Sequence, residues 1–471
     1  MLSDFPRRLA GRVARSLRSA ADRLEFSATP SQGAVAPSSA WIPPAMPGWV
    51  AEELRELAYI EPELLPADDS VDRFQFYSVP VDSAPGRAYR ELINAVGASP
   101  TSHIIMVPWL KAGGADRGAL YHVRAIMETD PDARVLVIAT EDAESPWAQK
   151  LPSGVRFVEF GKATRGLDFN KQVVVAIRLL VQLAPRTIHV INSRVGWECI
   201  ARHGLALTQF SSLYASLFCD DYTSRMVPVG YARDYLRTTL RWMAQVFTDN
   251  SEAPKVWARD LGIDASRFTV LPFPYDRPIA PLAPMVEGSV ASRVLWAGRL
   301  DRQKRPDILA AIAEAMPLCH FDVWGDRVMG PADPAIAKLH GLPNVTMHGA
   351  FDRLESVVSG EHFAYLHTSA WEGVPTILFD VAAAGLPICA PAIGGIPDFC
   401  DVDDLVQRFD DVPAFCQRLE SLRSDAELRK SLRAKQWNRL QETRQWSGFT
   451  GRLAEVQGYL NTSDSKERVR K

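Results

Sequence analysis

The sequence predicts an α/β protein built of two doubly wound parallel sheets. From residue 102 onward, short apolar runs alternate with amphipathic helical segments, which is the pattern of βα units. The alternation occurs in two series, and the proline-rich stretch Leu271–Pro284 separates them. A length of 471 residues with a hydrophobic fraction of 47% supplies enough apolar surface for two such cores. We therefore expect two Rossmann-like domains with a cleft between them, preceded by a helical and linker extension.

Residues 1–100 are expected to form that N-terminal extension. Residues 1–26 hold six Arg and place apolar side chains at near-helical spacing, which predicts a basic amphipathic helix. Three interpretations of this helix stay open: binding to an anionic membrane surface, packing on the body of the protein, and a targeting peptide. Ser27–Gly48 is rich in Ser, Pro and Ala and indicates a linker. Residues 50–100 contain a short acidic helix and no recognisable chemistry.

The first series of βα units occupies residues 101–280. Its predicted strands are His103–Val107, Arg134–Ala139, Arg186–Asn192, Ser211–Leu217 and Gln245–Thr248, with helices at Arg117–Glu128 and Asp168–Leu183 between them.

The second series occupies residues 281–445. Its predicted strands are Arg293–Ala297, His320–Trp324, Asn344–Met347, Phe363–His367 and Pro387–Ala390. Residues 446–471 are expected to form a C-terminal helix and a polar tail.

Charge and composition exclude several classes of protein. The net charge of −3 combines +3 on residues 1–26 and +2 on residues 461–471 with −8 on the rest, so no global positive field exists to bind nucleic acid. The longest apolar stretch, around residues 173–184, falls short of the roughly 20 residues that span a bilayer. The six Cys form no CxxC pair, which favours a reducing, cytoplasmic location, peripheral on the cytoplasmic membrane face if residues 1–26 bind lipid.

Two loops of the second series suit a bound anion. In the stretch Ser369–Asp380, Gly373 and Pro375 set a turn before a helix, so the N–H groups of Thr376 and Ile377 would face an anion such as a phosphate.

The other loop, Gly298–Pro306, follows the first strand of the same series. Gly298 would let a ligand approach the backbone, while Arg299 and Lys304 could grip a diphosphate from one loop.

The loops Gly298–Pro306 and Ser369–Asp380 resemble segments of the retaining glycosyltransferases of family four. Between them, Phe321–Asp326 and Leu342–Gly349 follow in the order expected for that family. The resemblance covers roughly residues 290–400 and implies the GT-B fold, with a first, acceptor domain facing a second, nucleotide-sugar donor domain. It also implies transfer of a hexose-type sugar from a nucleotide diphosphate donor to an acceptor hydroxyl, with retained anomeric configuration.

The resemblance assigns roles to residues by position. Arg299 and Lys304 match the pair that neutralises the donor diphosphate, and Glu372 matches the first Glu of the "Glu, seven residues, Glu" signature, which contacts the transferred sugar. Asp380 replaces the second Glu, which is held to the ribose hydroxyls, and is shorter by one methylene. Gly394–Asp398 matches a family turn that ends in Glu. The other residues expected at the donor are Gly298, Gly349, Phe351, Gly373, Val374, Pro375, Thr376 and Ile377.

The first series contributes weaker signals. Gly113 and Gly114 resemble the glycine loop that faces the donor phosphates across the cleft. His189 stands in a strand that resembles the family's His-x-His element, and it is either a catalytic residue or a satisfied core histidine. The downstream stretch Ser216–Asp221 lacks the His that the family often carries there.

No metal or other cofactor is expected, because Arg, Lys and a helix end are available for the leaving diphosphate. The acidic turns Asp130–Asp132 and Asp401–Asp404 are typical of connections between elements. The expected partners are the nucleotide sugar and a glycan or lipid-linked glycan acceptor of cell-surface polysaccharide or glycolipid assembly. Two alternatives stay open: a non-catalytic scaffold that binds nucleotide sugars, and a GT-B enzyme of another reaction such as a sugar-nucleotide epimerase.

Overall fold

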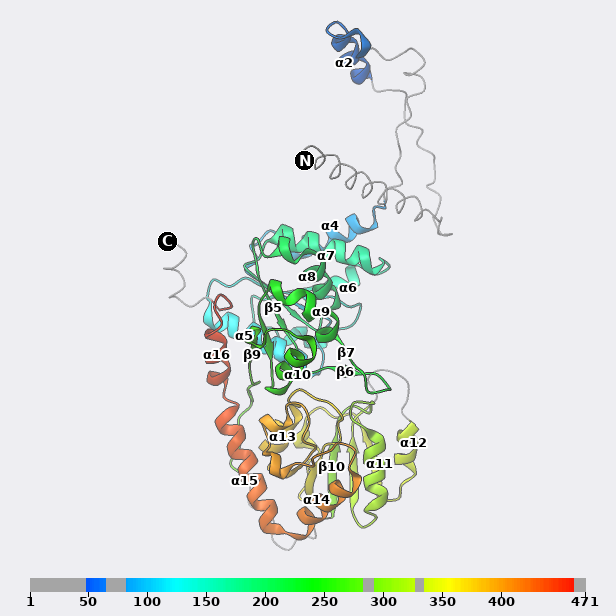
Figure 1. Cartoon of the computed structure of the whole chain (residues 1–471), viewed down its shortest axis with the longest axis vertical. Coiled ribbons are helices and arrows are strands. Elements are labelled where there is room, and N and C mark those ends of the chain that lie inside the picture. The colour runs from blue at the N-terminus through cyan, green and yellow to red at the C-terminus, as the bar shows by residue number, and fades with distance from the viewer. Residues whose placement is uncertain (1–47, 65–81, 283–291, 327–333, 461–471) are drawn as a thin grey trace, which may run out of the picture. The chain divides into compact units, whose positions relative to one another are not determined.

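A computed structural model describes residues 48–64, 82–282, 292–326 and 334–460 (Figure 1). The chain separates into two compact units, residues 1–82 and 83–471. In the first unit the described residues form helix α2, Gly48–Ala58, and the 3-10 turn η1, Pro62–Leu64. Helix α2 is the short acidic helix expected from the sequence. The predicted basic helix, residues 1–26, and residues 27–47 of the linker lie outside the described residues.

The second unit contains two parallel sheets, and the first has seven strands in the order β3-β2-β1-β4-β5-β8-β9. The strands are β1 His103–Val107, β2 Val135–Ala139, β3 Arg156–Glu159, β4 Thr187–Ile191, β5 Ser212–Ser216, β8 Met243–Thr248 and β9 Phe268–Val270. Five of them are the predicted strands. The edge strands β3 and β9 were not predicted, because their partly exposed side chains form no continuous apolar run.

Helices cover this first sheet. They are α4 Ala84–Val96, α5 Gly114–Thr129, α6 Phe160–Ala163, α7 Phe169–Leu183, α8 Arg194–Leu207, α9 Tyr231–Thr239 and α10 Glu252–Leu261. Helix α4 buries Leu92 and Val96 in the same apolar cluster as residues of α7. The core of the first sheet domain therefore includes residues N-terminal to position 101, where the sequence placed its start.

The second sheet has five parallel strands in the order β12-β11-β10-β13-β14. The strands are β10 Arg293–Ala297, β11 His320–Trp324, β12 Val345–Gly349, β13 His362–Leu366 and β14 Ile388–Cys389, and each overlaps a predicted strand. The helices are α11 Pro306–Ala315, α12 Pro334–Gly341, α13 Ile377–Ala383, α14 Val412–Ser424 and α15 Ala426–Thr443. The strand order reverses direction at β10 and β13, which is the point where doubly wound sheets bind ligands.

The C-terminal segment returns to the first sheet domain. Helix α16, Trp446–Ala454, lies beside α5 and β9 in Figure 1. The indole Nε1 of Trp446 donates to Glu128 at 2.8 Å, and Tyr459 is fully buried among residues of the first sheet. Residues 461–471, the predicted polar tail, lie outside the described residues. Within the part of the chain that the structure describes, no helix combines the length and apolarity needed to cross a membrane.

Candidate functional site

The two loops that the sequence singled out meet at the carboxyl ends of β10 and β13. The ammonium of Lys304 forms an ion pair with Oε1 of Glu372, and the two side chains are only 15% and 10% exposed. Nearby, the side-chain amide of Gln303 donates to the carbonyl of Trp371 at 2.8 Å, and the N–H of Ala370 donates to the carbonyl of Gln303 at 2.9 Å. The loops are thus bound side by side, with a buried charge pair at their junction.

Glu372 is ionised in this position although it is buried. Burial alone would raise its pKa, but the charge of Lys304 and a contact with His367 outweigh burial and hold the pKa well below its usual value. The Nε2 atom of His367 lies 3.4 Å from Oε1 of Glu372. Burial lowers the pKa of His367, so the imidazole is neutral beside the carboxylate at pH 7. His367 was not among the site residues expected from the sequence, although a polar residue at the end of a predicted strand is a signal of a site.

Arg299 lies on the same loop as Lys304 and is more exposed, at 39% of its side chain. Its guanidinium donates to Oε1 of Gln303 at 2.7 Å and lies 3.2 Å from the carboxylate of Asp301. Two cations therefore stand together at the carboxyl end of β10, one buried against Glu372 and one reaching toward solvent.

Two glycines let the backbone pass close to these loops. A Cβ at Gly325, where φ is +137°, would lie 1.8 Å from the carbonyl oxygen of Gly298. A Cβ at Gly394, where φ is +49°, would lie 1.9 Å from the carbonyl oxygen of Glu372. Any side chain at either position would displace a loop of the site.

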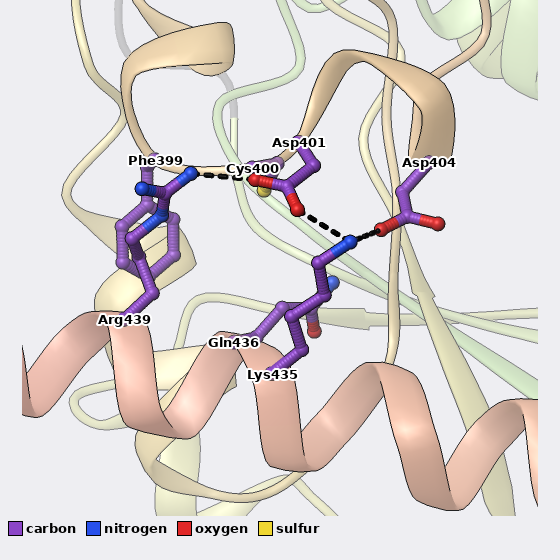
Figure 2. A pocket seen from close by; sticks show the side chains of 7 residues that line it. All are labelled: Phe399, Cys400, Asp401, Asp404, Lys435, Gln436 and Arg439. Atoms are coloured by element: carbon purple, nitrogen blue, oxygen red, sulfur yellow. Dashed lines mark hydrogen bonds and ion pairs between the residues drawn. The ribbon is translucent and has the colours of Figure 1, made fainter.

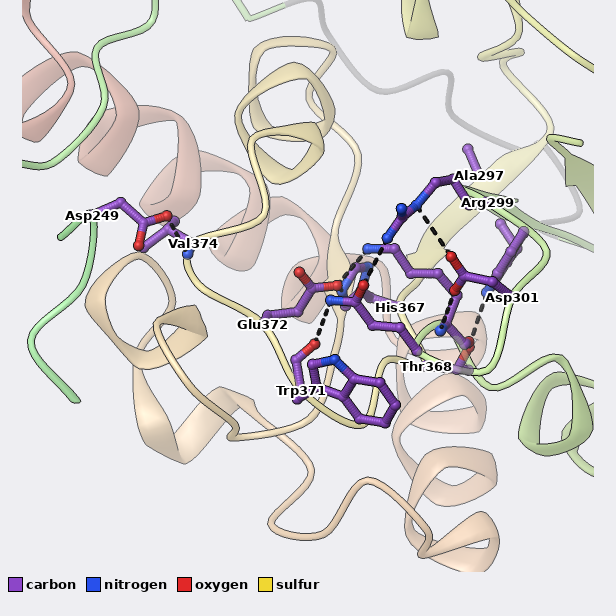
Figure 3. Close-up of polar contacts among 12 residues, drawn as sticks. Asp249, Ala297, Arg299, Asp301, His367, Thr368, Trp371, Glu372 and Val374 are labelled. Carbon is purple, nitrogen blue, oxygen red and sulfur yellow. Dashed lines mark hydrogen bonds and ion pairs between the residues drawn. The ribbon is translucent and has the colours of Figure 1, made fainter. Parts of the chain in front are cut away.

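The first sheet domain holds the Glu372 loop through residues that follow β8. The carboxylate of Asp249 accepts the N–H of Val374 at 2.8 Å, and a Cβ at Gly373 would lie 2.7 Å from that carboxylate (Figure 3). The N–H and hydroxyl of Ser251 donate to Asp398 at 2.6 and 2.7 Å. These contacts fix the turn that precedes α13 and the Gly394–Asp398 turn against the first domain.

Asp249 is a fully enclosed carboxylate. Burial raises its pKa to about 7, although hydrogen bonds from Asn250 and Val374 favour the ionised form. Neither Asp249 nor Ser251 was expected at the site from the sequence. They follow the predicted strand Gln245–Thr248, so polar residues at a strand end were again the available signal.

The glycine loop of the first domain faces the start of α13. Gly113 is the N-cap residue of α5, and a Cβ at Gly114 would lie 3.9 Å from the side chain of Thr376. Thr376 is the N-cap residue of α13 and makes no side-chain cap bond, while Ile377 opens this seven-residue helix. The structure therefore brings together residues that the sequence placed on opposite sides of the cleft.

The remaining predicted donor residues all lie in the second sheet domain. Val374 and Pro375 are buried in the turn before α13. Gly349, at φ +82°, ends β12, and its carbonyl accepts the N–H of Gly325 at 2.7 Å. Phe351 packs in the loop that follows. Asp380 is buried in α13, with Oδ1 3.3 Å from the guanidinium of Arg277.

His189 is not brought to this site. It is fully buried in the first sheet, where Nδ1 lies 2.8 Å from the hydroxyl of Tyr459 and Nε2 lies 2.9 Å from the hydroxyl of Ser216. Burial, together with the neighbouring His122, holds its pKa well below the usual value. Its environment is that of the satisfied core histidine, which was the second interpretation from the sequence, because the C-terminal segment covers it.

The acidic turns hold ion pairs. Asp401 and Asp404 both pair with Lys435, and Arg439 donates to Asp401 at 2.6 Å, around a small pocket beside α15 (Figure 2). Across the residues described here, no group of three or more His, Cys, Asp or Glu is arranged to hold a metal ion.

Comparisons with known proteins agree with this architecture. Residues 291–425, which span the second sheet, match the family model described as "Glycosyl transferases group 1". The match spans less than a third of the chain. A search of curated proteins finds no match.

Similar solved structures cover both sheet domains. The Anabaena protein HepE in complex with UDP and glucose is 15% identical, with 76% of this chain and 99% of that chain covered at a TM-score of 0.57. The lipopolysaccharide outer core galactosyltransferase WaaB is 14% identical (76% and 98% covered, TM-score 0.57). Sucrose-phosphate synthase from Thermosynechococcus elongatus is 16% identical (76% and 98% covered, TM-score 0.57). The likeness shows that the chain has the GT-B fold, which confirms the predicted fold class.

Proposed function

We propose that this protein is a retaining glycosyltransferase of the family-four type, which moves a hexose from a nucleotide diphosphate donor to an acceptor hydroxyl. The observation that carries the proposal is the buried pair of Lys304 and Glu372 with Arg299 beside it, at the reversal point of the sheet that matches the group 1 glycosyltransferases. An anion and two cations at this point suit a donor that separates into a negative diphosphate and a positive sugar ring.

The two cations stabilise the leaving diphosphate in this proposal. Arg299 presents a planar fork to phosphate oxygens, while the ammonium of Lys304 keeps two N–H bonds for phosphate when the third faces Glu372. The two charges act where negative charge grows as the glycosidic bond breaks. In other sites a divalent cation neutralises the charge of the leaving diphosphate. Because Arg299 and Lys304 supply positive charge here, we expect turnover to persist in EDTA.

Glu372 orients the sugar in this proposal. Because Lys304 and His367 keep its carboxylate ionised, Glu372 accepts hydrogen bonds from sugar hydroxyls and reduces the free energy of the positively charged ring. The acceptor oxygen then bonds to the anomeric carbon on the face that the diphosphate leaves. The bond from that carbon to the phosphate oxygen breaks, and a phosphate oxygen takes the acceptor's proton, so the configuration is retained.

The first domain closes the site. Asp249 and Ser251 hold the turns around Glu372, and Gly114 brings the glycine loop next to Thr376. A site closed by both domains excludes water and limits hydrolysis of the donor.

We place the acceptor at a membrane surface on the cytoplasmic side, as a glycan or lipid-linked glycan of polysaccharide or glycolipid assembly. The support is the basic, amphipathic pattern of residues 1–26, whose Arg side chains suit an anionic bilayer. Co-sedimentation with phosphatidylglycerol vesicles is expected to fall when residues 1–26 are deleted. Equal sedimentation of the full chain and the deletion would remove this part of the proposal.

The proposal is tested by incubating the full chain with UDP-, GDP- and ADP-sugars and measuring release of the nucleoside diphosphate. The wild type is expected to release one of them, and Arg299→Ala to release it at a rate lower by about 10²-fold, the effect of losing one transition-state donor. Arg408→Ala removes an exposed Arg paired with Asp410 and serves as the matched control. Equal rates for Arg299→Ala and the control would refute the role of this loop.

A further inference from the structure

Arg277 lies in the segment that connects the two sheets, and its side chain contacts the second sheet domain. Its guanidinium donates to Oε1 of Glu355 at 2.9 Å and lies 3.3 Å from Oδ1 of Asp380. Glu355 belongs to the short turn η5, Leu354–Ser356, and Asp380 belongs to α13. One arginine from outside the sheet thus bridges two carboxylates on different elements of this domain.

Asp380 has an incomplete set of partners. Its side chain is 10% exposed, and Oδ1 has no hydrogen-bond partner of good geometry among the described residues. A buried carboxylate oxygen without a hydrogen bond is costly, since it has lost its water. Oδ1 is closed off from solvent and faces Arg277, so the exposed tenth of the Asp380 side chain is the part left for hydroxyl groups of a ligand.

The short side chain makes the position of this carboxylate critical. Asp has one methylene less than Glu, so its carboxylate ends about 1.5 Å nearer the helix. A ligand hydroxyl reaches it only if the carboxylate is held at the edge of α13. Arg277, 3.3 Å from Oδ1 and also paired with Glu355, supplies an attractive charge that restrains the carboxylate.

We infer that Arg277 is a positioning residue that holds Asp380 toward the ribose hydroxyls of the donor, and so sets the selection of ribonucleotides over 2′-deoxyribonucleotides. The inference rests on the proposed function, because it requires a nucleotide donor at this site. It adds a residue outside the sheet domain that controls which nucleotide is accepted.

The charge of Arg277 also favours the ionised form of Asp380, which supports its role as a positioning residue. Burial raises the pKa of Asp380, and the charges of Arg117 and Arg277 oppose that rise. Loss of Arg277 removes one of the two charges that oppose this rise. An ionised acceptor makes a hydrogen bond to a hydroxyl roughly twice as strong as a neutral one.

The test compares binding of a ribonucleoside diphosphate with that of its 2′-deoxy analogue to the full chain, by titration calorimetry. The probe is UDP, GDP or ADP, whichever binds the wild type most tightly, together with its deoxy form. We expect the wild type to prefer the ribonucleotide by about tenfold, the value of one charge-assisted hydrogen bond. The preference is expected to fall to near one in Arg277→Ala and in Asp380→Ala, and to be partly kept in Arg277→Lys. A purely structural role would weaken binding of both nucleotides by the same factor.

The outcomes separate this inference from the proposed function. A preference in Arg277→Ala and Arg277→Lys equal to that of the wild type overturns the inference while nucleotide binding stands. A preference that survives in Asp380→Ala, or that is absent from the wild type, also overturns it. Failure of the wild type to bind any of the three nucleotides overturns the inference and the proposed function together. If Arg277→Ala does not fold, as judged by circular dichroism, the comparison with Arg277→Lys decides.

Discussion

Replacing Lys304 by methionine removes the charge that balances Glu372. Methionine keeps the length and apolar stem of lysine, so Lys304→Met isolates the loss of the ammonium. The carboxylate of Glu372 then lies in a buried position beside the neutral His367.

The expected loss of stability in Lys304→Met follows from the burial of both side chains of the pair. The two side chains are 15% and 10% exposed, so water screens their attraction weakly. Removing one partner of a buried ion pair costs about 3–5 kcal/mol in free energy of unfolding, because the other charge is left uncompensated. We expect Lys304→Met to lose stability of this order at pH 7.5.

The pH dependence of the free energy of unfolding is a more specific test than the size of the loss at one pH. In the wild type the folded-state pKa of Glu372 lies below its unfolded value of 4.5, so its contribution is present above about pH 4.5 and is lost as the pH falls. In Lys304→Met, burial raises the folded-state pKa above the unfolded value, so the variant loses stability as the pH rises. The difference in stability between wild type and variant is therefore expected to be larger at pH 7.5 than at pH 5.

Urea unfolding of the full chain at both pH values measures this difference. The control is Lys338→Met, which breaks an exposed pair with Glu314, 49% and 45% exposed, and is expected to cost less than about 1 kcal/mol at either pH. A cost for Lys304→Met as small as that of the control, or one that is the same at both pH values, would refute the electrostatic account of Glu372.

Two further predictions concern buried polar groups. Asp249 has a folded-state pKa of about 7 against 3.8 unfolded, so ionisation of the unfolded chain lowers wild-type stability as the pH rises from about 4 to 7. Asp249→Asn cannot ionise, and its stability relative to the wild type should rise over that range in urea unfolding; a flat difference would contradict the burial of this carboxylate. Tyr459→Phe removes the hydroxyl that lies 2.8 Å from Nδ1 of both His122 and His189, and should cost about 1–3 kcal/mol while leaving nucleotide release at saturating donor unchanged. Loss of that release in Tyr459→Phe would instead return His189 to a role in turnover.

The sequence predicts the five inner strands of the first sheet and all five strands of the second. Apolar runs such as His103–Val107 and Arg293–Ala297 are recognisable because both faces of a parallel strand are covered. The edge strands Arg156–Glu159 and Phe268–Val270 lack that signal because they are partly exposed.

Part of the candidate site was predictable from the arrangement of parallel strands. The carboxyl ends of neighbouring parallel strands meet at one edge, so Lys304 and Glu372 could be expected together although 68 residues separate them. Contacts between the two sheet domains have no such local signal. Asp249 meets Val374 across 125 residues, and Tyr459 covers His189 across 270, so only the folded chain shows these partners.

The most direct test of the account is the rate at which the full chain releases nucleoside diphosphate from its nucleotide sugar, compared between the wild type and Glu372→Gln. Gln keeps the size of the side chain but removes the charge that Lys304 and His367 hold in place. We expect release by the wild type, and a large loss of rate in Glu372→Gln with binding of the nucleoside diphosphate alone retained. Equal rates in the two proteins, or no release by the wild type from any UDP-, GDP- or ADP-sugar, would contradict it.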